Sequence, residues 1–362
     1  MRALLTPPFL HRSHTRMYSR TQRCIEEHES GVDDDDLLAC LCDLFQTIST
    51  QRKRCGVHPP RRFVAKLRKE NEVFNNQMHQ DAHEFLNYLL NEMAEILEKR
   101  NKKAAEANGA GSSGAAAAEE EDGGDAASPE KGDNGSSSGS SSRYVPKTWI
   151  HSIFEGLLTN ETRCLACDSV TSRDESFLDL SLEIEQNSSV SSCMRNFSAN
   201  ESLRGDNKFY CDTCCSLQEA HKRMRIKRLP NVLALHLKRF KYVEQIQRFK
   251  KLSYRIAFPI DLKLTNVCDE AVDPDRKYRL FAVIVHAGSG PNHGHYVALV
   301  RAHNQWLCFD DDVIEPIEEA QIQAYFGNSL ETAGSTETGY LLFYQTEPAS
   351  WDDGGEREVE VP

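Results

Sequence analysis

Two Cys-x-x-Cys pairs constrain the fold of this chain more than any other feature of its sequence. The pairs are Cys164 with Cys167 and Cys211 with Cys214, and 43 residues lie between them. Each pair presents two thiolates from one tight turn, and the two pairs together complete the tetrahedral sulfur shell that suits zinc. Because the separation is longer than in a compact zinc finger, we expect strands to run between the pairs. They would carry one structural Zn²⁺ ion at the tip of a long β extension.

Other interpretations of this region remain open. A redox-active Cys-x-x-Cys usually occurs once, beside a βαβ unit, whereas this chain has two. Cys215, adjacent to Cys214, is a possible substitute ligand. The basic run 221–228 suits either an exposed strand or the nucleic-acid patch of a zinc ribbon. A net charge of -12 argues against nucleic acid as the main partner and suits a basic protein partner instead.

The composition also bounds the compartment. The chain has 12 cysteines and no secretory signal, a combination that favours metal binding or catalysis over disulfides. No apolar run approaches the roughly 18 residues that a membrane span needs. We therefore expect a cytoplasmic or nuclear protein that does not bind a membrane.

The order of the predicted elements indicates an α+β fold. Apolar residues in 37–48 fall on one helical face, behind a run of aspartates that suits a helix N-terminus. A second apolar stripe covers residues 85–97, and Asp81 with Glu84 ahead of it resembles a capping box. Strands are predicted later in the chain, at residues 177–184, 232–237, 280–285 and 340–344. Helices first and strands later are typical of the α+β class.

Residues 100–143 should form a disordered insertion. Of these 44 residues, 27 are Gly, Ala or Ser, and none is Ile, Leu, Val, Met or aromatic. Such a segment cannot bury enough apolar surface to offset its ordering entropy. The acidic tail 347–362 is expected to be disordered for the same reason.

Near its end, the chain carries a histidine and several aspartates that a β-hairpin would bring together. Residues 295–301 and 306–310 have the composition of strands, and residues 302–305 that of a turn. If this turn centres on Ala302 and His303, the two strands have a defined register.

In that register His295 and Asp310 lie directly opposite each other, with Cβ atoms about 4.5–5.5 Å apart. A shift of the turn by one residue would place Asp312 opposite His295 and Asp310 on the diagonal. A carboxylate in this position holds an imidazole in one tautomer, so that the imidazole can deprotonate a nucleophile. The alternative is a solvated acidic turn beside a half-buried histidine.

These segments together resemble the ubiquitin-specific proteases, a large family of papain-like cysteine deubiquitinases. The resemblance covers roughly residues 37–346, and its motifs occur in the family's order: residues 80–86, the two Cys-x-x-Cys pairs, and residues 229–240, 294–296, 306–312 and 339–344. It implies a hand-shaped fold with a helical thumb, a β palm and zinc-tipped β fingers. The expected division is an atypical N-terminus over 1–36 and a catalytic domain over 37–346, made of thumb 37–99, insertion 100–143, fingers 144–228 and palm 229–346.

By position, the resemblance makes His295 the general base and Asp310 the residue that orients it, with Asp311 as an assistant. It also assigns the contact with ubiquitin, and the channel for ubiquitin's Gly-Gly tail, to six residues: Gln80, Asp81, Gly288, Gly290, Gly294 and Tyr296. Glycines in such a loop let a substrate backbone pass closely. The implied activity is thiol-dependent hydrolysis of peptide or isopeptide bonds at the C-terminal glycine of ubiquitin, with ubiquitin and ubiquitinated proteins as partners.

Finer features resemble one subgroup of the family, whose members are weak alone and are activated by WD40-repeat proteins. These features are residues 68–71, 158–164 and 286–292. A WD40-repeat activator is therefore an expected partner.

The cysteine box that begins the family's catalytic domain, Asn-x-Cys-Tyr-x-Asn-Ser-x-Leu-Gln, has no match here. The first Asn of the chain is Asn71, and the nearest candidate nucleophile is Cys24, whose acidic neighbours disfavour a thiolate. Cys40 and Cys42 are expected to be small core residues. We therefore expect a chain cut just after its nucleophile, with little or no hydrolytic activity. The alternative is a non-catalytic scaffold that binds ubiquitin or a WD40-repeat protein.

Overall fold

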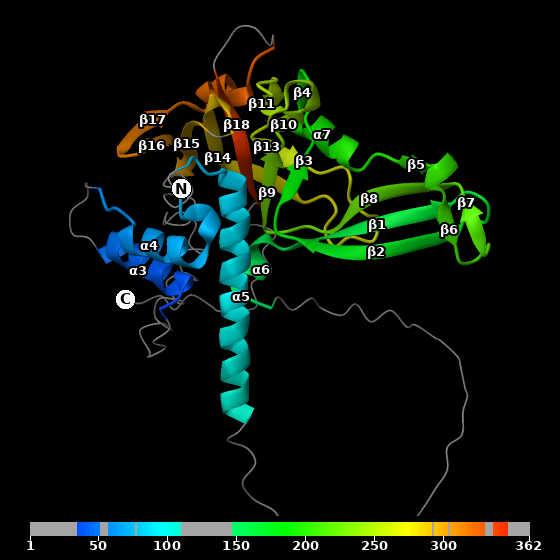
Figure 1. Cartoon of the computed structure of the whole chain (residues 1–362), viewed down its shortest axis with the longest axis horizontal. Coiled ribbons are helices and arrows are strands. Elements are labelled where there is room, and N and C mark those ends of the chain that lie inside the picture. Colours follow the sequence, from blue (N-terminus) through cyan, green and yellow to red (C-terminus); the bar gives the residue numbers. More distant parts are fainter. Residues whose placement is uncertain are drawn as a thin grey trace, which may run out of the picture.

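Helices from the first third of the chain pack against a large β-sheet built from its second half (Figure 1). The computed structural model describes residues 35–50, 57–76, 78–109, 147–291, 293–302, 305–329 and 336–346. Within these residues the α-helices are α3 (Leu37–Thr50), α4 (Arg61–Glu70), α5 (Ala82–Gly109), α6 (Trp149–Phe154) and α7 (Val190–Phe197). The short 3-10 helices are η1 (Glu72–Phe74), η2 (Gly205–Asn207), η3 (Glu244–Ile246) and η4 (Glu319–Phe326).

The expected first helix is α3, and its N-terminus is capped by an aspartate. Asp36 accepts a hydrogen bond from the backbone N–H of Ala39 at 2.8 Å, which satisfies one of the donors that a helix start leaves open.

The C-terminal end of the predicted helical region differs from expectation. Helix α5 continues to Gly109, beyond the point at Arg100 where we expected disorder to begin. Arg100 pairs with Asp36 at 2.6 Å, and the residues after it are mostly good helix formers. Residues 110–143 of the expected insertion lie outside the described residues.

The palm sheet has eight strands, ordered β17-β16-β15-β14-β18-β9-β3, with β13 also paired to β14. All neighbours run antiparallel except β3 and β9. The strands are β3 (Leu180–Leu182), β9 (Val232–Leu237), β13 (Asp261–Lys263), β14 (Lys277–Gly290), β15 (His293–Ala302), β16 (Gln305–Asp310), β17 (Val313–Ile317) and β18 (Glu337–Thr346).

Both faces of the palm sheet are covered, which explains why the middle of a central strand, such as residues 280–285 of β14, is continuously apolar. In β14, Ala282 and Ile284 face the core shared with the thumb helices α3, α4 and α5. Val283 and Val285 face a second core on the opposite side, where α7 and η4 pack. The alternation follows from the two-residue period of a strand.

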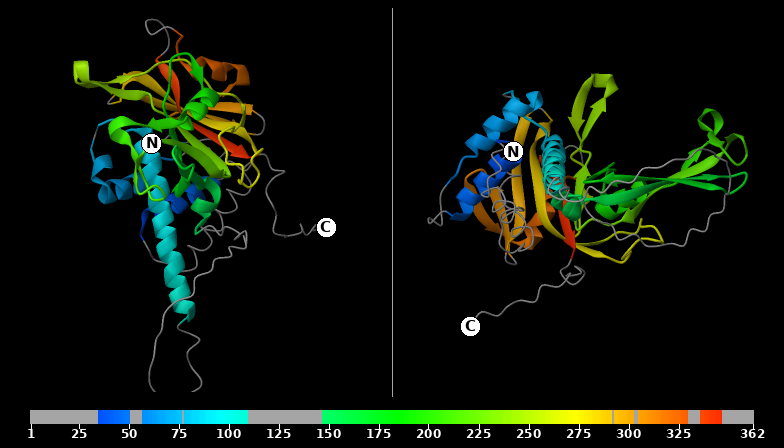
Figure 2. Two further views of the ribbon diagram at one scale, coloured as in Figure 1. Left: turned by 90° about the vertical axis from the view of Figure 1, so that its right-hand side faces the viewer. Right: turned by 90° about the horizontal axis from the view of Figure 1, so that it is seen from below.

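The finger sheet projects away from the palm (Figure 2, right). Its four strands are ordered β2 (Val170–Phe177), β1 (Gly156–Cys164), β8 (Ala220–Arg228) and β5 (Glu201–Leu203). Three two-stranded pairs complete the β structure: β6 (Phe209–Cys211) with β7 (Ser216–Gln218), β10 (Phe240–Val243) with β11 (Arg248–Lys251), and β4 (Ser188–Ser189) with β12 (Ile256–Ala257). Helices and strands are thus segregated as the sequence predicts, and the α+β class is confirmed.

The basic run 221–228 lies in β8, where its cations pair with carboxylates of neighbouring segments. The partners are Glu161 for Arg223 at 2.7 Å, Asp269 for Arg225 at 3.0 Å, Asp174 for Lys227 at 2.6 Å and Glu155 for Arg228 at 2.8 Å. Cations that are neutralised in this way do not form a phosphate-binding surface. The structure therefore favours the exposed-strand interpretation.

Among the described helices, none combines the length and the apolar character that crossing a membrane requires.

Candidate catalytic and metal sites

The structure brings His295 and Asp310 into contact at the open end of a hairpin. The Nε2 atom of His295 lies 2.5 Å from Oδ1 of Asp310. The two residues belong to β15 and β16, in which Ala302 pairs with Gln305. The turn therefore lies at residues 303–304, one residue later than the centre that we predicted, and Asp310 is diagonal to His295. These turn residues themselves lie outside the described part of the chain.

The His295–Asp310 pair is accessible to a substrate. The side chains of His295 and Asp310 are 45% and 55% exposed. Asp311 joins the group, because its carboxylate and those two side chains have ligand atoms within 4.8 Å of one another. Asp311 has a φ of 52°, in the left-handed region, where the chain turns from β16 into β17. Such a conformation is tolerated best by glycine, asparagine and aspartate.

The glycine loop, residues 288–294, spans the end of β14 and the start of β15. At two of its positions the backbone conformation requires glycine. Pairing is interrupted between Ala287 and Gly290 by a β-bulge, and Gly288 and Gly294 have φ values of +143° and +148°. A Cβ atom at Gly294 would lie 2.5 Å from the carbonyl oxygen of Ala287. Gly290 has no such restriction and pairs with His293 at the loop end. Gly288 and Gly294 are therefore required by the close packing of the loop on its own backbone and on His286.

Asp81 connects the thumb to the palm. Its Oδ1 atom accepts hydrogen bonds from the backbone N–H groups of His83 at 2.7 Å and Glu84 at 3.3 Å, so it caps α5. Its Oδ2 atom accepts a hydrogen bond of 2.6 Å from the hydroxyl of Tyr340 on β18. Both oxygens of the carboxylate thus have partners within the chain, and no sequence pattern indicated the second one.

Tyr296, the neighbour of His295, also contacts the start of α5. Its hydroxyl accepts a hydrogen bond from the backbone N–H of Ala82 at 3.3 Å, and the ring of His79 stacks on it. Burial raises the pKa of Tyr296, so the hydroxyl stays protonated. Gln80 turns its side chain back to its own loop, where its amide donates to Asn76 at 2.6 Å.

A cleft of about 370 Å³ lies between these elements. Its walls come from the start of α5, from the β10–β11 hairpin and from β18, and include Gln80, Asp81, Glu84, Phe240, Phe249 and Tyr340. Pro291 of the glycine loop also borders it. The cleft therefore brings two of the predicted substrate-binding residues, Gln80 and Asp81, to the same space as that loop.

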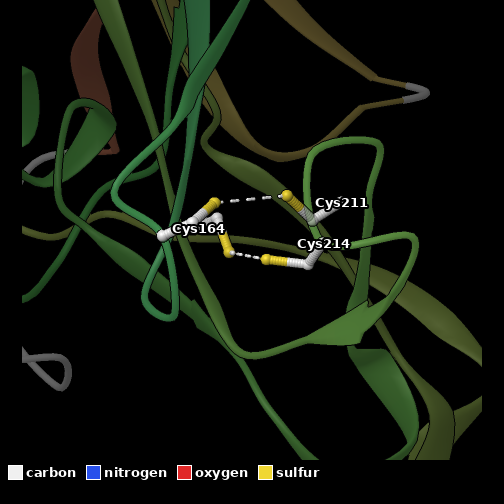
Figure 3. A group of neighbouring side chains, drawn as sticks. Cys164, Cys211 and Cys214 are labelled. Carbon is white, nitrogen blue, oxygen red and sulfur yellow. Dashed lines mark hydrogen bonds between the residues drawn. The ribbon is translucent and has the colours of Figure 1, made fainter.

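The four predicted metal ligands form one cluster at the far end of the finger sheet (Figure 3). Cys164 ends β1 and Cys211 ends β6, and all four sulfur atoms lie within 4.8 Å of one another. The Sγ–Sγ distances are 4.0 Å for Cys164 with Cys214 and 3.6 Å for Cys167 with Cys211. Tetrahedral zinc with Zn–S bonds of about 2.3 Å separates sulfur atoms by about 3.8 Å, so the residues fit this ion.

Three other cysteines that the sequence singled out, Cys40, Cys42 and Cys215, lie outside the metal cluster. Cys215 is exposed, donates to the carbonyl oxygen of Asp212 and is not part of the cluster, so it is not the substitute ligand. Cys40 and Cys42 are 1% and 3% exposed, which confirms that they are core residues. Cys24 lies outside the described residues.

Two buried cations near the glycine loop were not anticipated from the sequence. Arg239 is fully buried, and its guanidinium donates to the carbonyl oxygens of Gly339, Leu252 and Tyr254. Lys251 is buried and also bonds only backbone carbonyls among the described residues. For neither side chain does a residue close in the sequence indicate that it would be buried.

One family model, ubiquitin carboxyl-terminal hydrolase, matches residues 2–344, and the chain belongs to that family. The resemblance stated from the sequence motifs is thereby confirmed.

Relatives support the same assignment. The chain is 54% identical over 313 residues to ubiquitin carboxyl-terminal hydrolase 4 of Arabidopsis thaliana, covering 86% of this chain and 82% of the relative. It is 50% identical over 316 residues to ubiquitin carboxyl-terminal hydrolase 12 of Salmo salar, covering 86% and 79%.

Solved structures share the fold. The SAGA DUB module of Ubp8, Sgf11, Sus1 and Sgf73 bound to monoubiquitin matches with a TM-score of 0.68 at 24% identity. The match covers 95% of this chain and 66% of that one, so the chain spans just under two thirds of its length. The same module bound to ubiquitin aldehyde matches with a TM-score of 0.66 at 23% identity.

Proposed function

We propose that this chain carries the base and the substrate site of a thiol-dependent deubiquitinase, which hydrolyses peptide and isopeptide bonds at the C-terminal glycine of ubiquitin. The observation that carries the proposal is the exposed contact between His295 and Asp310, 2.5 Å long, on the strand that follows the glycine loop. Family membership supports it, and so does the SAGA DUB module, which has the same fold and is bound to monoubiquitin.

The contact between Nε2 and Asp310 suggests how the base works. When Asp310 accepts the Nε2–H bond, the lone pair of the imidazole is on Nδ1, which can then take the proton of a cysteine thiol. The thiolate attacks the carbonyl carbon of the terminal glycine, and His295 returns the proton to the leaving amine. Water then hydrolyses the acyl-enzyme and releases the ubiquitin carboxylate. Asp311 assists by adding negative charge beside the imidazolium.

The described residues leave the nucleophile of this mechanism open. Ten of the 12 cysteines lie in the described residues, and none of these ten is a hydrogen-bond partner of His295 there. We propose that hydrolysis requires a cysteine that these ten do not supply. A second candidate function follows from the same observation: a non-catalytic scaffold that holds ubiquitin or a WD40-repeat protein.

The partners are proposed from the site and the motifs. Ubiquitin's tail would run along the glycine loop, past Tyr296, and the cleft at Gln80 and Asp81. The segments 68–71, 158–164 and 286–292 support a WD40-repeat activator. We further propose that the four-cysteine cluster holds one structural Zn²⁺ ion, which would fix the finger strands and, with four protein ligands, would not contact substrate.

Two measurements on the same polypeptide test the proposal. Titration calorimetry with monoubiquitin should detect binding, and an electrophilic probe built on the ubiquitin C-terminus should leave no covalent adduct. Lack of ubiquitin binding would refute the deubiquitinase and the ubiquitin-binding scaffold, and only a scaffold for a WD40-repeat protein would remain. An adduct at Cys24 would show that the chain has its own nucleophile. The transcript sequence upstream of the Met1 codon separates the candidates, because an in-frame cysteine box favours the protease and its absence favours the scaffold.

A further inference from the structure

Lys251 makes three hydrogen bonds to the backbone around the glycine loop. The residue ends β11 and is 5% exposed. Its Nζ atom donates to the carbonyl oxygens of His286 at 2.7 Å, Gly288 at 3.0 Å and Thr336 at 2.6 Å. A lysine ammonium has three N–H donors and no acceptor, so this arrangement uses all of them.

The three acceptors lie at the end of β14 and just before β18, which the sheet ladder already pairs through Ala287 and Glu337. The hairpin β10–β11, which carries Lys251, belongs to a separate two-stranded sheet. His286 and Gly288 flank Ala287, and Ala287 is the residue that pairs directly with His295. Regular pairing of β14 with β15 is interrupted immediately after Ala287. Thr336 precedes β18, which begins at Glu337. One side chain therefore joins the hairpin β10–β11, the end of β14 and the start of β18.

The charges around this ammonium give it little compensation. Burial and, to a smaller extent, the charge of Arg239 lower the pKa of Lys251 to about 7, and Glu337 acts in the opposite direction. His286 is neutral, because burial lowers its pKa to about 3. A buried ammonium held by carbonyls alone is costly, and an apolar residue would usually fill such a space at least as well. The cation is therefore better explained by what it positions than by its contribution to stability.

We propose that Lys251 is a positioning residue for the His295 site, which fixes the carbonyls on both sides of Ala287 and so holds the glycine loop open for a ubiquitin tail. The identity of the tail rests on the proposed function. The fixing of the loop does not, since it concerns contacts within the chain.

The test compares Lys251→Met with Lys250→Met, an exposed lysine on the same strand, in the full chain. Hydrogen exchange should accelerate at least about tenfold in residues 286–296 of Lys251→Met, with the fingers and α5 unchanged, and should not change in Lys250→Met. Monoubiquitin and ubiquitin lacking its Gly-Gly tail are then titrated, and Lys251→Met should lose the affinity difference between them. Unchanged exchange in the loop, acceleration spread over the whole palm, or a retained affinity difference would each overturn the proposal.

The wild-type chain offers a test without substitution, which also covers a variant that fails to fold. A neutral amine keeps only two N–H donors, so one carbonyl loses its partner when Lys251 deprotonates. Loop protection, corrected for intrinsic exchange, should therefore fall between roughly pH 6 and roughly pH 9, and constant protection would contradict the proposal. If wild type binds no ubiquitin, the proposed function fails, while both exchange measurements still decide the role of Lys251.

Discussion

The hydroxyl of Tyr340 joins the palm to the thumb, and its removal should weaken the whole fold. Tyr340 is 2% exposed and donates a 2.6 Å hydrogen bond to Oδ2 of Asp81. Tyr340→Phe deletes one oxygen atom and keeps the ring, with its contacts to His236 and Phe240. Because the acceptor is an ionised carboxylate, the expected cost is about 1.5–3 kcal/mol of the free energy of unfolding.

A matched control lies on the same strand. Tyr344 is 0% exposed, and its hydroxyl donates to a neutral acceptor, the carbonyl oxygen of Pro259, at 2.8 Å. Tyr344→Phe is the same chemical deletion in an equally buried place, and it should cost about 0.5–1.5 kcal/mol. The charge on Asp81 is thus expected to make Tyr340→Phe more destabilising by about 1 kcal/mol.

Urea unfolding measures both costs, followed by the fluorescence of Trp149 and Trp306, which lie in α6 and β16. The comparison uses unfolding midpoints at a common m value, and the combination of Tyr340→Phe with Asp81→Asn isolates the pairwise term. If Tyr340→Phe costs no more than Tyr344→Phe, the hydroxyl–carboxylate bond is not the link between thumb and palm that the structure indicates.

Three further outcomes are expected. Elemental analysis of the purified chain should find one zinc ion. Cys211→Ser should lose this ion and Cys215→Ser should keep it. Equal zinc contents in the two variants would refute the proposed set of four cysteine ligands. Burial lowers the pKa of His286 to about 3, whereas a histidine in the unfolded chain has a pKa near 6.5, so the free energy of unfolding should fall as the pH drops below about 6.5, by about 2 kcal/mol at about pH 5. In urea unfolding, His286→Gln should show a shallower dependence of this free energy on pH, and an equal dependence would count against the argument. Gly294→Ala places a Cβ 2.5 Å from the carbonyl oxygen of Ala287 and should lower the free energy of unfolding, measured by calorimetry, by about 3 kcal/mol or more. The control Gly205→Ala, where nothing lies within 4 Å of the added Cβ, should lower it by about 1 kcal/mol. Similar losses in the two variants would mean that the loop adapts.

Local patterns predicted the elements and the metal cluster because their determinants are close in sequence. The apolar stripe of α3, the apolar run in β14 and the two Cys-x-x-Cys pairs each depend on residues a few positions apart. The bond from Tyr340 to Asp81 spans 259 positions, and the bonds of Lys251 span up to 85. Neither side chain has a local pattern that identifies its partner, so no spacing argument could have found these contacts.

The end of α5 shows a different limit. Composition predicted disorder from Arg100 onward, yet the helix continues to Gly109. Residues 102–107 lack large apolar side chains but consist of lysine, alanine and glutamate, which have high helix propensity. A segment can therefore extend a helix that packing has already nucleated, even though it could not nucleate one alone.

The His295–Asp310 contact was predicted from a register that proved to be shifted, and strand geometry explains why the prediction survived. In an antiparallel hairpin, moving the turn by one whole residue changes each partner by two positions, so the same residues remain on the same face. His295 thus keeps Asp310 on its face, as a diagonal neighbour in place of a direct one. If the centre of the turn had moved by half a residue, Asp311 would have been opposite His295, and Asp310 would have been on the other face of the sheet. The orienting role of Asp310 therefore depends on the parity of the register between β15 and β16, which the buried face of β16 keeps fixed.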